Sequence, residues 1–151
     1  MNFQKWTEKS IESIGFAQSL ATENGNSQIE QEHLLLALMS QENGLIPEIL
    51  KSFGFDMARM IELVQDKISR LSKVSGQSQV YMSNDLNQVL IEAERQAKTM
   101  QDEYVSVEHI LLGLLQKSNR VLSEVFKQFN IKFFTFAFWV EHTYLFILSL
   151  F

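Results

Sequence analysis

Apolar side chains recur along the chain at helical intervals. Ile14, Ala17 and Ala21 follow one another at steps of three and four residues. Comparable sets lie further along, at Leu34, Leu35 and Leu38, at Met60, Ile61, Val64, Ile68 and Leu71, at Leu86, Val89, Leu90, Ala93 and Ala97, and at Leu111, Leu112 and Leu115. Such steps place side chains on one face of an α-helix, whereas no stretch keeps the two-residue alternation of a strand for long. The pattern predicts an all-α fold.

An internal repeat organises this pattern. Residues 32–38 (EHLLLAL) return 76 positions later as residues 108–114 (EHILLGL). The match continues without a gap and pairs Ala17 with Ala93, Asn43 with Asn119 and Phe53 with Phe129, among others. A repeated sequence usually means a repeated supersecondary unit. We therefore expect a pseudo-two-fold helical bundle made of two repeats of about four helices.

Capping residues and a polar linker suggest where the units begin and end. Thr7 and Ser83 are expected N-caps of the first helix of each repeat, and Ser106 of the helix that carries the second Glu-His pair. The segment between the repeats is rich in Ser, Gln and Gly, as linkers are. The expected boundaries are repeat 1 at about 7–71, a linker at about 72–82, and repeat 2 at about 83–131, all within one domain over 1–132.

Composition and charge exclude several functions. Acidic side chains number 18 against 13 basic ones, a formal charge of -5, so nucleic acid is not an expected partner. The absence of cysteine removes thiol catalysis. The sequence also lacks the glycine-lysine loop that cradles nucleotide phosphates. We therefore expect no enzyme activity, no catalytic residue and no cofactor.

Two Glu-His pairs are the residues that could carry chemistry. Glu32-His33 and Glu108-His109 could supply zinc ligands. A zinc helix motif places its two His one turn apart, whereas these pairs would meet only if the repeats faced each other. We expect hydrogen-bonded His at helix starts and no metal, with a metal-dependent hydrolase built on these four residues as a rival. The two carboxylates, in first helical turns where the helix dipole favours negative charge, could instead receive a guanidinium or a backbone donor.

The C-terminal segment 133–151 differs in composition from the rest. It holds six of the twelve Phe residues and one formal charge, Glu141. We expect a truncated or frameshifted product whose tail packs partly on the bundle. A membrane anchor is the alternative, because 19 residues of helix span about 28 Å, near the thickness of a bilayer core, although Glu141 and His142 lie mid-segment. Without a signal peptide at the N-terminus, we expect the cytoplasm.

The doubled Glu-His-Leu/Ile-Leu-Leu segment on a gapless helical repeat resembles the Clp R domain, the N-terminal substrate-receiving module of the Clp AAA+ unfoldases. Residues 3–10, 29–34 and 43–50 are most similar to the ClpB disaggregase branch. The resemblance covers residues 1 to about 132. It implies a pseudo-two-fold domain of about eight helices, flexibly tethered to ATPase rings that this sequence does not contain.

The resemblance also implies a site, a groove that engages unfolded or aggregated chains. Carried over position by position, its polar residues are Thr7, Asp102 and Glu108. Its apolar lining lies around Leu90 and Ile91, and near His109 and Ile110. In the related ClpC branch the Glu of each motif, here Glu32 and Glu108, receives the guanidinium of phosphorylated arginine.

We therefore expect a binding module without catalysis of its own. Its expected partners are unfolded or aggregated client proteins, with adaptor proteins as a further class. A charge at Leu90 or Ile91 is expected to weaken client capture while leaving the helices intact. The alternatives are a membrane-anchored Clp-type adaptor that uses 133–151, and a phosphoarginine-binding module of the ClpC type.

Overall fold

Eight helices and two short strands make up the described part of this computed structural model, which covers residues 2–76 and 79–150, with side chains to residue 142. In chain order the elements are α1 (Glu8–Glu23), β1 (Gln28–Ile29), α2 (Gln31–Met39), α3 (Leu45–Ser52), α4 (Met57–Ser69), β2 (Tyr81–Met82), α5 (Asn84–Thr99), α6 (Val107–Gln116), α7 (Arg120–Gln128) and α8 (Phe133–Leu150). The all-α expectation is confirmed.

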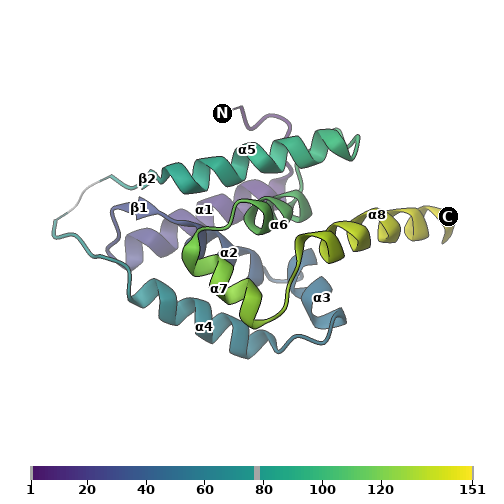
Figure 1. Cartoon of the computed structure of the whole chain (residues 1–151). Helices are drawn as coiled ribbons and strands as arrows, with labels where there is room; N and C mark the ends of the chain where they lie inside the picture. Colours follow the sequence, from purple (N-terminus) through teal and green to yellow (C-terminus); the bar gives the residue numbers. More distant parts are fainter. Residues whose placement is uncertain (1, 77–78, 151) are drawn as a thin grey trace.

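The two repeats have the same order of helices. Shifted by 76 positions, α1 to α4 fall on α5 to α8 (Figure 1). The contact between repeats is doubled as well, because β1 pairs in parallel with β2, Ile29 opposite Met82, and an isolated bridge joins Trp6 to Val105, the positions equivalent to Met82 and Ile29. The predicted pseudo-two-fold bundle is thus confirmed.

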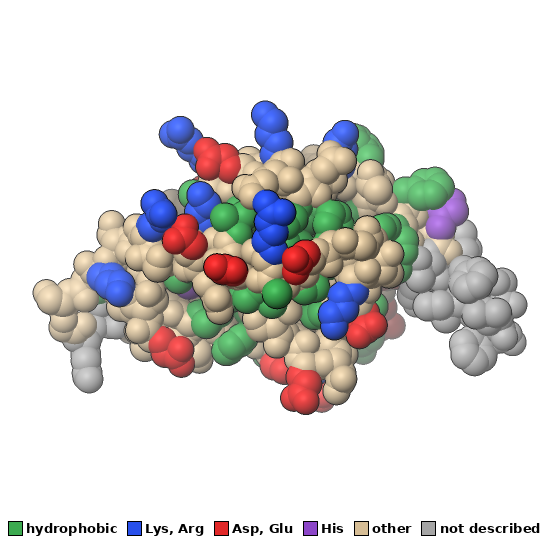
Figure 2. Space-filling model, turned by 90° about the horizontal axis from the view of Figure 1, so that it is seen from below, with side chains coloured by type: hydrophobic (Ala, Val, Ile, Leu, Met, Phe, Trp, Pro, Cys, Tyr) green, Lys and Arg blue, Asp and Glu red, His purple; other side chains and the backbone are tan. Residues whose placement is uncertain are grey.

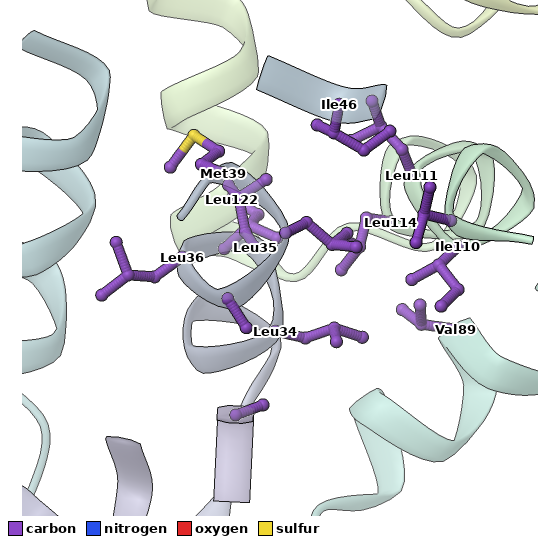
Figure 3. Packing of buried hydrophobic residues seen from close by; sticks show 14 of the residues in the cluster. Leu34, Leu35, Leu36, Met39, Ile46, Val89, Ile110, Leu111, Leu114 and Leu122 are labelled. Carbon is purple, nitrogen blue, oxygen red and sulfur yellow. The ribbon is translucent and has the colours of Figure 1, made fainter. Parts of the chain in front are cut away.

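The core lies where the central helices of the two repeats meet. Every residue of α2 is buried, as expected for a helix that is surrounded on all sides. Figure 3 shows Leu34 and Leu35 of α2 directed towards the side of α6 that carries Leu111 and Leu114. The repeated apolar motif is therefore the part of each repeat that packs against the other.

The predicted caps have the expected geometry. The Thr7 hydroxyl accepts a hydrogen bond from the Ser10 amide at 3.2 Å, and the Ser83 hydroxyl accepts one from the Leu86 amide at 3.1 Å. Ser106 is the N-cap of α6. The Thr7 and Ser83 hydroxyls each satisfy a donor that the first helical turn would otherwise leave unpaired.

The described part of the C-terminal segment packs as a last helix. α8 starts at Phe133, the position equivalent to Met57 at the start of α4, and it contacts α6. Phe136 is only 2% exposed and corresponds to Met60 of α4, which is fully buried. Among the described residues, no helix combines the length and apolarity that crossing a membrane requires.

Candidate functional site

Each Glu-His pair lies in the first turn of a central helix, α2 or α6, and its His side chain caps that helix. His33 Nδ1 accepts the Glu30 amide hydrogen at 2.8 Å, and His109 Nδ1 accepts that of Ser106 at 2.9 Å. Because Nδ1 accepts, Nε2 carries the ring proton and donates it to Asn26 Oδ1 or to Asp102 Oδ2, at 2.9 Å and 2.8 Å. Both ring nitrogens are therefore engaged within the fold.

These bonds leave the His residues unsuited to bind a metal. The lone pair a metal would need is already used at Nδ1. Within the described ranges, no group of three His, Asp, Glu or Cys side chains lies together. The structure thus does not assemble Glu32, His33, Glu108 and His109 into the site that a metal-dependent hydrolase requires.

The equivalent His residues face different partners. Burial lowers the pKa of His33 to about 4, so this ring is neutral at pH 7 opposite the neutral Asn26 amide. His109 instead faces a carboxylate, Asp102, whose side chain is 29% exposed. The second His of the pseudo-symmetric pair thus faces a carboxyl group where the first faces an amide.

Glu32 is engaged inside the protein. Its side chain is buried, and Oε1 accepts a hydrogen bond from Asn119 Nδ2 at 2.7 Å. Next to it, Gln31 Nε2 donates to the Asp85 and Lys117 carbonyls, and Gln31 Oε1 accepts the Asn119 amide at 2.8 Å. The first Glu of the repeat therefore joins the two repeats, and a ligand could reach it only by displacing Asn119.

Glu108 has a different environment. It is half-buried, and desolvation raises the pKa of its carboxyl, an effect that the nearby Asp102 adds to and His109 opposes. Asn43 is the position equivalent to Asn119, yet no hydrogen bond between Asn43 and Glu108 occurs in the described structure. Glu108 is therefore the more accessible of the two motif carboxylates.

Nearby, one buried polar atom lacks a partner. Gln41 Nε2 donates to the Lys9 carbonyl at 2.8 Å. Lys9 is the position equivalent to Asp85, whose carbonyl accepts the hydrogen bond from Gln31. The Oε1 atom of Gln41 is buried without a hydrogen bond, the one such side-chain atom among those described. The two halves of the bundle thus differ in polar detail although their helices match.

The structure brings Thr7 to the segment that carries Asp102 and Glu108. The Thr7 amide donates to the Val105 carbonyl at 3.0 Å, and the Ser10 hydroxyl donates to the same carbonyl. Beside this contact, Ile11 is 41% exposed and Tyr104 is 47% exposed. We call Thr7, Ile11, Asp102, Tyr104 and Glu108 the bridge surface, because they flank the Trp6–Val105 bridge.

The expected apolar lining is mostly inside the core. Leu90 and Ile110 have no exposed surface and His109 is 1% exposed, whereas Ile91 is 52% exposed. The expectation that a charge at Leu90 would leave the helices intact is therefore wrong, because it would place an unpaired charge in the core. Only Ile91 of this set faces solvent.

Sequence reasoning missed two features of the site. It gave no role to Gln31 or Asn119, although the pairing of Asn119 with Asn43 in the repeat pointed to the loop involved. It also missed Ile11 and Tyr104, since an exposed apolar residue has no signal of its own in a sequence.

The comparisons with known proteins agree with this architecture. The Clp repeat (R) N-terminal domain matches residues 5–129, and the chain belongs to this family. The chaperone protein ClpB of Nitratidesulfovibrio vulgaris is 34% identical over 136 residues, which are 87% of this chain and 16% of that protein. The chain thus spans about a sixth of the length of that relative.

Solved structures share the fold. The Hsp104 N-terminal domain of Candida albicans superimposes with a TM-score of 0.77 at 23% identity and covers 89% of this chain and 87% of that one. A ClpV N-domain solved in complex with VipB peptide superimposes with a TM-score of 0.67 at 20% identity, over 83% of this chain and 79% of that one. The fold, repeat and family expected from the sequence are therefore confirmed.

Proposed function

We propose that the chain is the client- or adaptor-binding N-terminal module of a ClpB-like disaggregase and binds unfolded polypeptide at the bridge surface. The observation that carries the proposal is the exposure of Ile11 and Tyr104 beside Thr7, Asp102 and Glu108 in a Clp R domain. That a related N-domain was solved with a peptide supports a polypeptide ligand.

The bridge surface combines two kinds of contact. Burial of apolar area contributes about 25 cal/mol per Å², which suits clients that expose core side chains and share no motif. The carboxylates of Asp102 and Glu108 can accept backbone amides or cationic side chains of the client, and these hydrogen bonds orient it. Neither kind of contact requires a catalytic group.

Binding by this module would need a motor to become unfolding. The matched relative is about five times as long as this chain, and the ATPase modules that the family implies are not present in this chain. We propose that the module works in the cytoplasm, where it holds clients for such a motor.

A single guanidinium site at Glu108 is the second candidate. Glu108 is half-buried, and desolvation raises the pKa of its carboxyl. The positive charge of a bound guanidinium would offset this loss of hydration and favour the carboxylate. The two-site version, with Glu32, is disfavoured because Asn119 occupies that carboxylate.

Client capture tests the proposal. Labelled, permanently reduced α-lactalbumin is titrated with the full chain by fluorescence anisotropy. Ile11→Glu, on the bridge surface, should weaken binding about fivefold or more, since about 1 kcal/mol of apolar contact is lost. Val74→Glu, at a 43% exposed apolar residue in the linker, is the matched control and should bind as the unmodified chain does.

Two further variants separate the candidates. Glu108→Gln should weaken α-lactalbumin binding, and it should abolish any binding of free phosphoarginine measured by calorimetry. Ile91→Glu tests Ile91, the one exposed residue of the apolar set carried over from the family. Unchanged affinity in Ile11→Glu and Glu108→Gln together would remove the bridge surface as the site.

A further inference from the structure

A cavity of about 270 Å³ lies beside the loop that joins α7 to α8. Its apolar part is formed by Leu115, Phe126, Ile131 and Phe133, and all of these except Phe126 are only half-buried. Apolar surface is therefore accessible inside the cavity. The volume lies just below the range of about 300–1,000 Å³ that is usual for drug-sized ligands, so the cavity suits a smaller molecule. None of its residues belongs to the bridge surface.

The polar part of the cavity consists of hydrogen-bond donors. The residues are Ser118, Ser123, Lys127, Asn130 and Lys132. The hydroxyl oxygens of Ser118 and Ser123 lie 2.8 Å apart, and a bond between them uses only one of the two hydroxyl hydrogens. The other hydrogen, the Asn130 amide and the two ammonium groups are available to donate to a ligand.

The two lysines of the cavity have no carboxylate partner in the described structure. Both are exposed, and none of the ion pairs among the described residues involves Lys127 or Lys132. The one acidic side chain between residues 117 and 132 is Glu124, which pairs with Arg120 at 3.7 Å. On the lower face of the molecule, where α4 and α7 lie in Figure 1, Lys and Arg side chains lie beside hydrophobic surface (Figure 2).

The equivalent segment of the first repeat has the opposite charge. Residues 117–132 contain four basic side chains and one acidic one, whereas residues 41–56 contain one basic and three acidic ones. Shifted by 76 positions, Ser118 corresponds to Glu42, and Lys132 corresponds to Asp56. Because the helices of the two repeats match, the fold itself does not require this positive charge. The basic cavity is a feature of the second repeat alone.

We propose that this cavity binds a small oxyanion, a carboxylate or a phosphate ester, that is carried on a hydrocarbon group. The lysines and the remaining Ser hydroxyl hydrogen bind the anion through charge-assisted hydrogen bonds. The accessible surface of Leu115, Ile131 and Phe133 packs against the hydrocarbon group. A polyanion suits the site less well, because it would extend over the surface of a chain whose formal charge is -5. The proposal stands independently of client binding at the bridge surface.

Titration with phenylpropionate and with phenyl phosphate tests the proposal. Each is added to the isotope-labelled full chain, and the backbone amides are followed by NMR. Each should bind with a dissociation constant of about 1 mM and shift the amides of Ser118, Ser123 and Lys132 more than those of the bridge surface. The tighter of the two anions identifies the source of the oxyanion, an organic acid or a phosphate ester.

Two further probes separate the two parts of the site. Phenylpropanamide keeps the hydrocarbon group but lacks the charge, and inorganic phosphate keeps the charge but lacks the hydrocarbon group. Each should bind at least tenfold more weakly than the organic anions. Equal binding of the amide, or of inorganic phosphate, would overturn the proposal, because one part of the cavity would then have no role.

Three variants locate the binding. Lys132→Asp should weaken both organic anions at least tenfold and leave the circular dichroism unchanged, because Asp56 caps α4 at the equivalent position. Lys127→Gln should weaken them about threefold. Lys51→Gln, at the position equivalent to Lys127 and outside the cavity, is the matched control and should bind as the unmodified chain does. No binding by the unmodified chain at about 10 mM of either anion, or unchanged affinity in Lys132→Asp, would refute the site.

Discussion

At the residue scale, sequence identity between the repeats hides different chemistry. His33 and His109 occupy equivalent positions and accept equivalent backbone hydrogens. One faces an amide, Asn26, and the other a carboxylate, Asp102. A single side-chain difference at the second partner therefore gives the two equivalent His rings different chemical neighbours.

The His33 site predicts a pH dependence. The pKa of His33 is about 4 in the folded chain and near 6.5 when unfolded, so between these values the unfolded state binds more protons. The free energy of unfolding should therefore fall as pH drops from about 6.5 towards 4, by up to about 1.4 kcal/mol per pH unit from this residue. Urea unfolding at several pH values, with an NMR titration of the His33 ring, measures it.

Asn26→Asp is the matched variant, since it gives His33 the partner that His109 has. The new carboxylate should raise the pKa of His33 and flatten the part of the pH dependence that this residue causes. A His33 ring that titrates near 6.5 in the unmodified chain would contradict the prediction.

At the scale of elements, the packing of α5 against α6 depends on one glycine. α5 and α6 pack so closely that a Cβ at Gly113 would lie 2.6 Å from the Val89 carbonyl oxygen. The equivalent position in the first repeat is Ala37, so the α1–α2 pair accommodates the extra carbon. The repeats therefore differ in helix spacing as well as in polar contacts.

Two glycine substitutions test this packing. Gly113→Ala should destabilise the fold by about 1–3 kcal/mol, because backbone cannot move aside as a side chain can. Gly15→Ala, within α1 and with nothing within 4 Å of its added carbon, should stabilise it by up to about 1 kcal/mol through helix propensity. Thermal unfolding followed by circular dichroism compares the two. Equal effects of the same sign would show that propensity, and not the α5–α6 contact, governs position 113.

At the scale of the whole molecule, the repeats are joined by an asymmetric polar link. Gln31 and Glu32 of α2 hold the loop before α7 through Asn119. Asn119 also caps α7, with Oδ1 accepting the Leu122 amide hydrogen at 2.8 Å. One side chain thus starts a helix in the second repeat and binds the first.

Asn119→Asp separates these two roles. An Asp retains the cap but sets a carboxylate against that of Glu32, so the free energy of unfolding should fall by about 2–3 kcal/mol. In the double variant Glu32→Gln, Asn119→Asp, the Gln amide can donate to the Asp carboxylate. This variant should recover most of the lost free energy of unfolding. Urea denaturation of the four chains forms a double-mutant cycle, and no coupling between the two positions would contradict the link.

The sequence by itself determined the helices, the repeat and the family of this protein. Apolar period, capping residues and self-similarity are local or linear properties, so Thr7, Ser83 and the two Glu-His motifs could be placed without coordinates. The tertiary structure alone decided which of the matched residues are accessible. Leu90 and Glu32 look like ligand contacts in a linear comparison, yet the first is in the core and the second holds Asn119. Burial and cross-repeat bonding depend on neighbours from distant parts of the chain, and these differ between halves whose helices match.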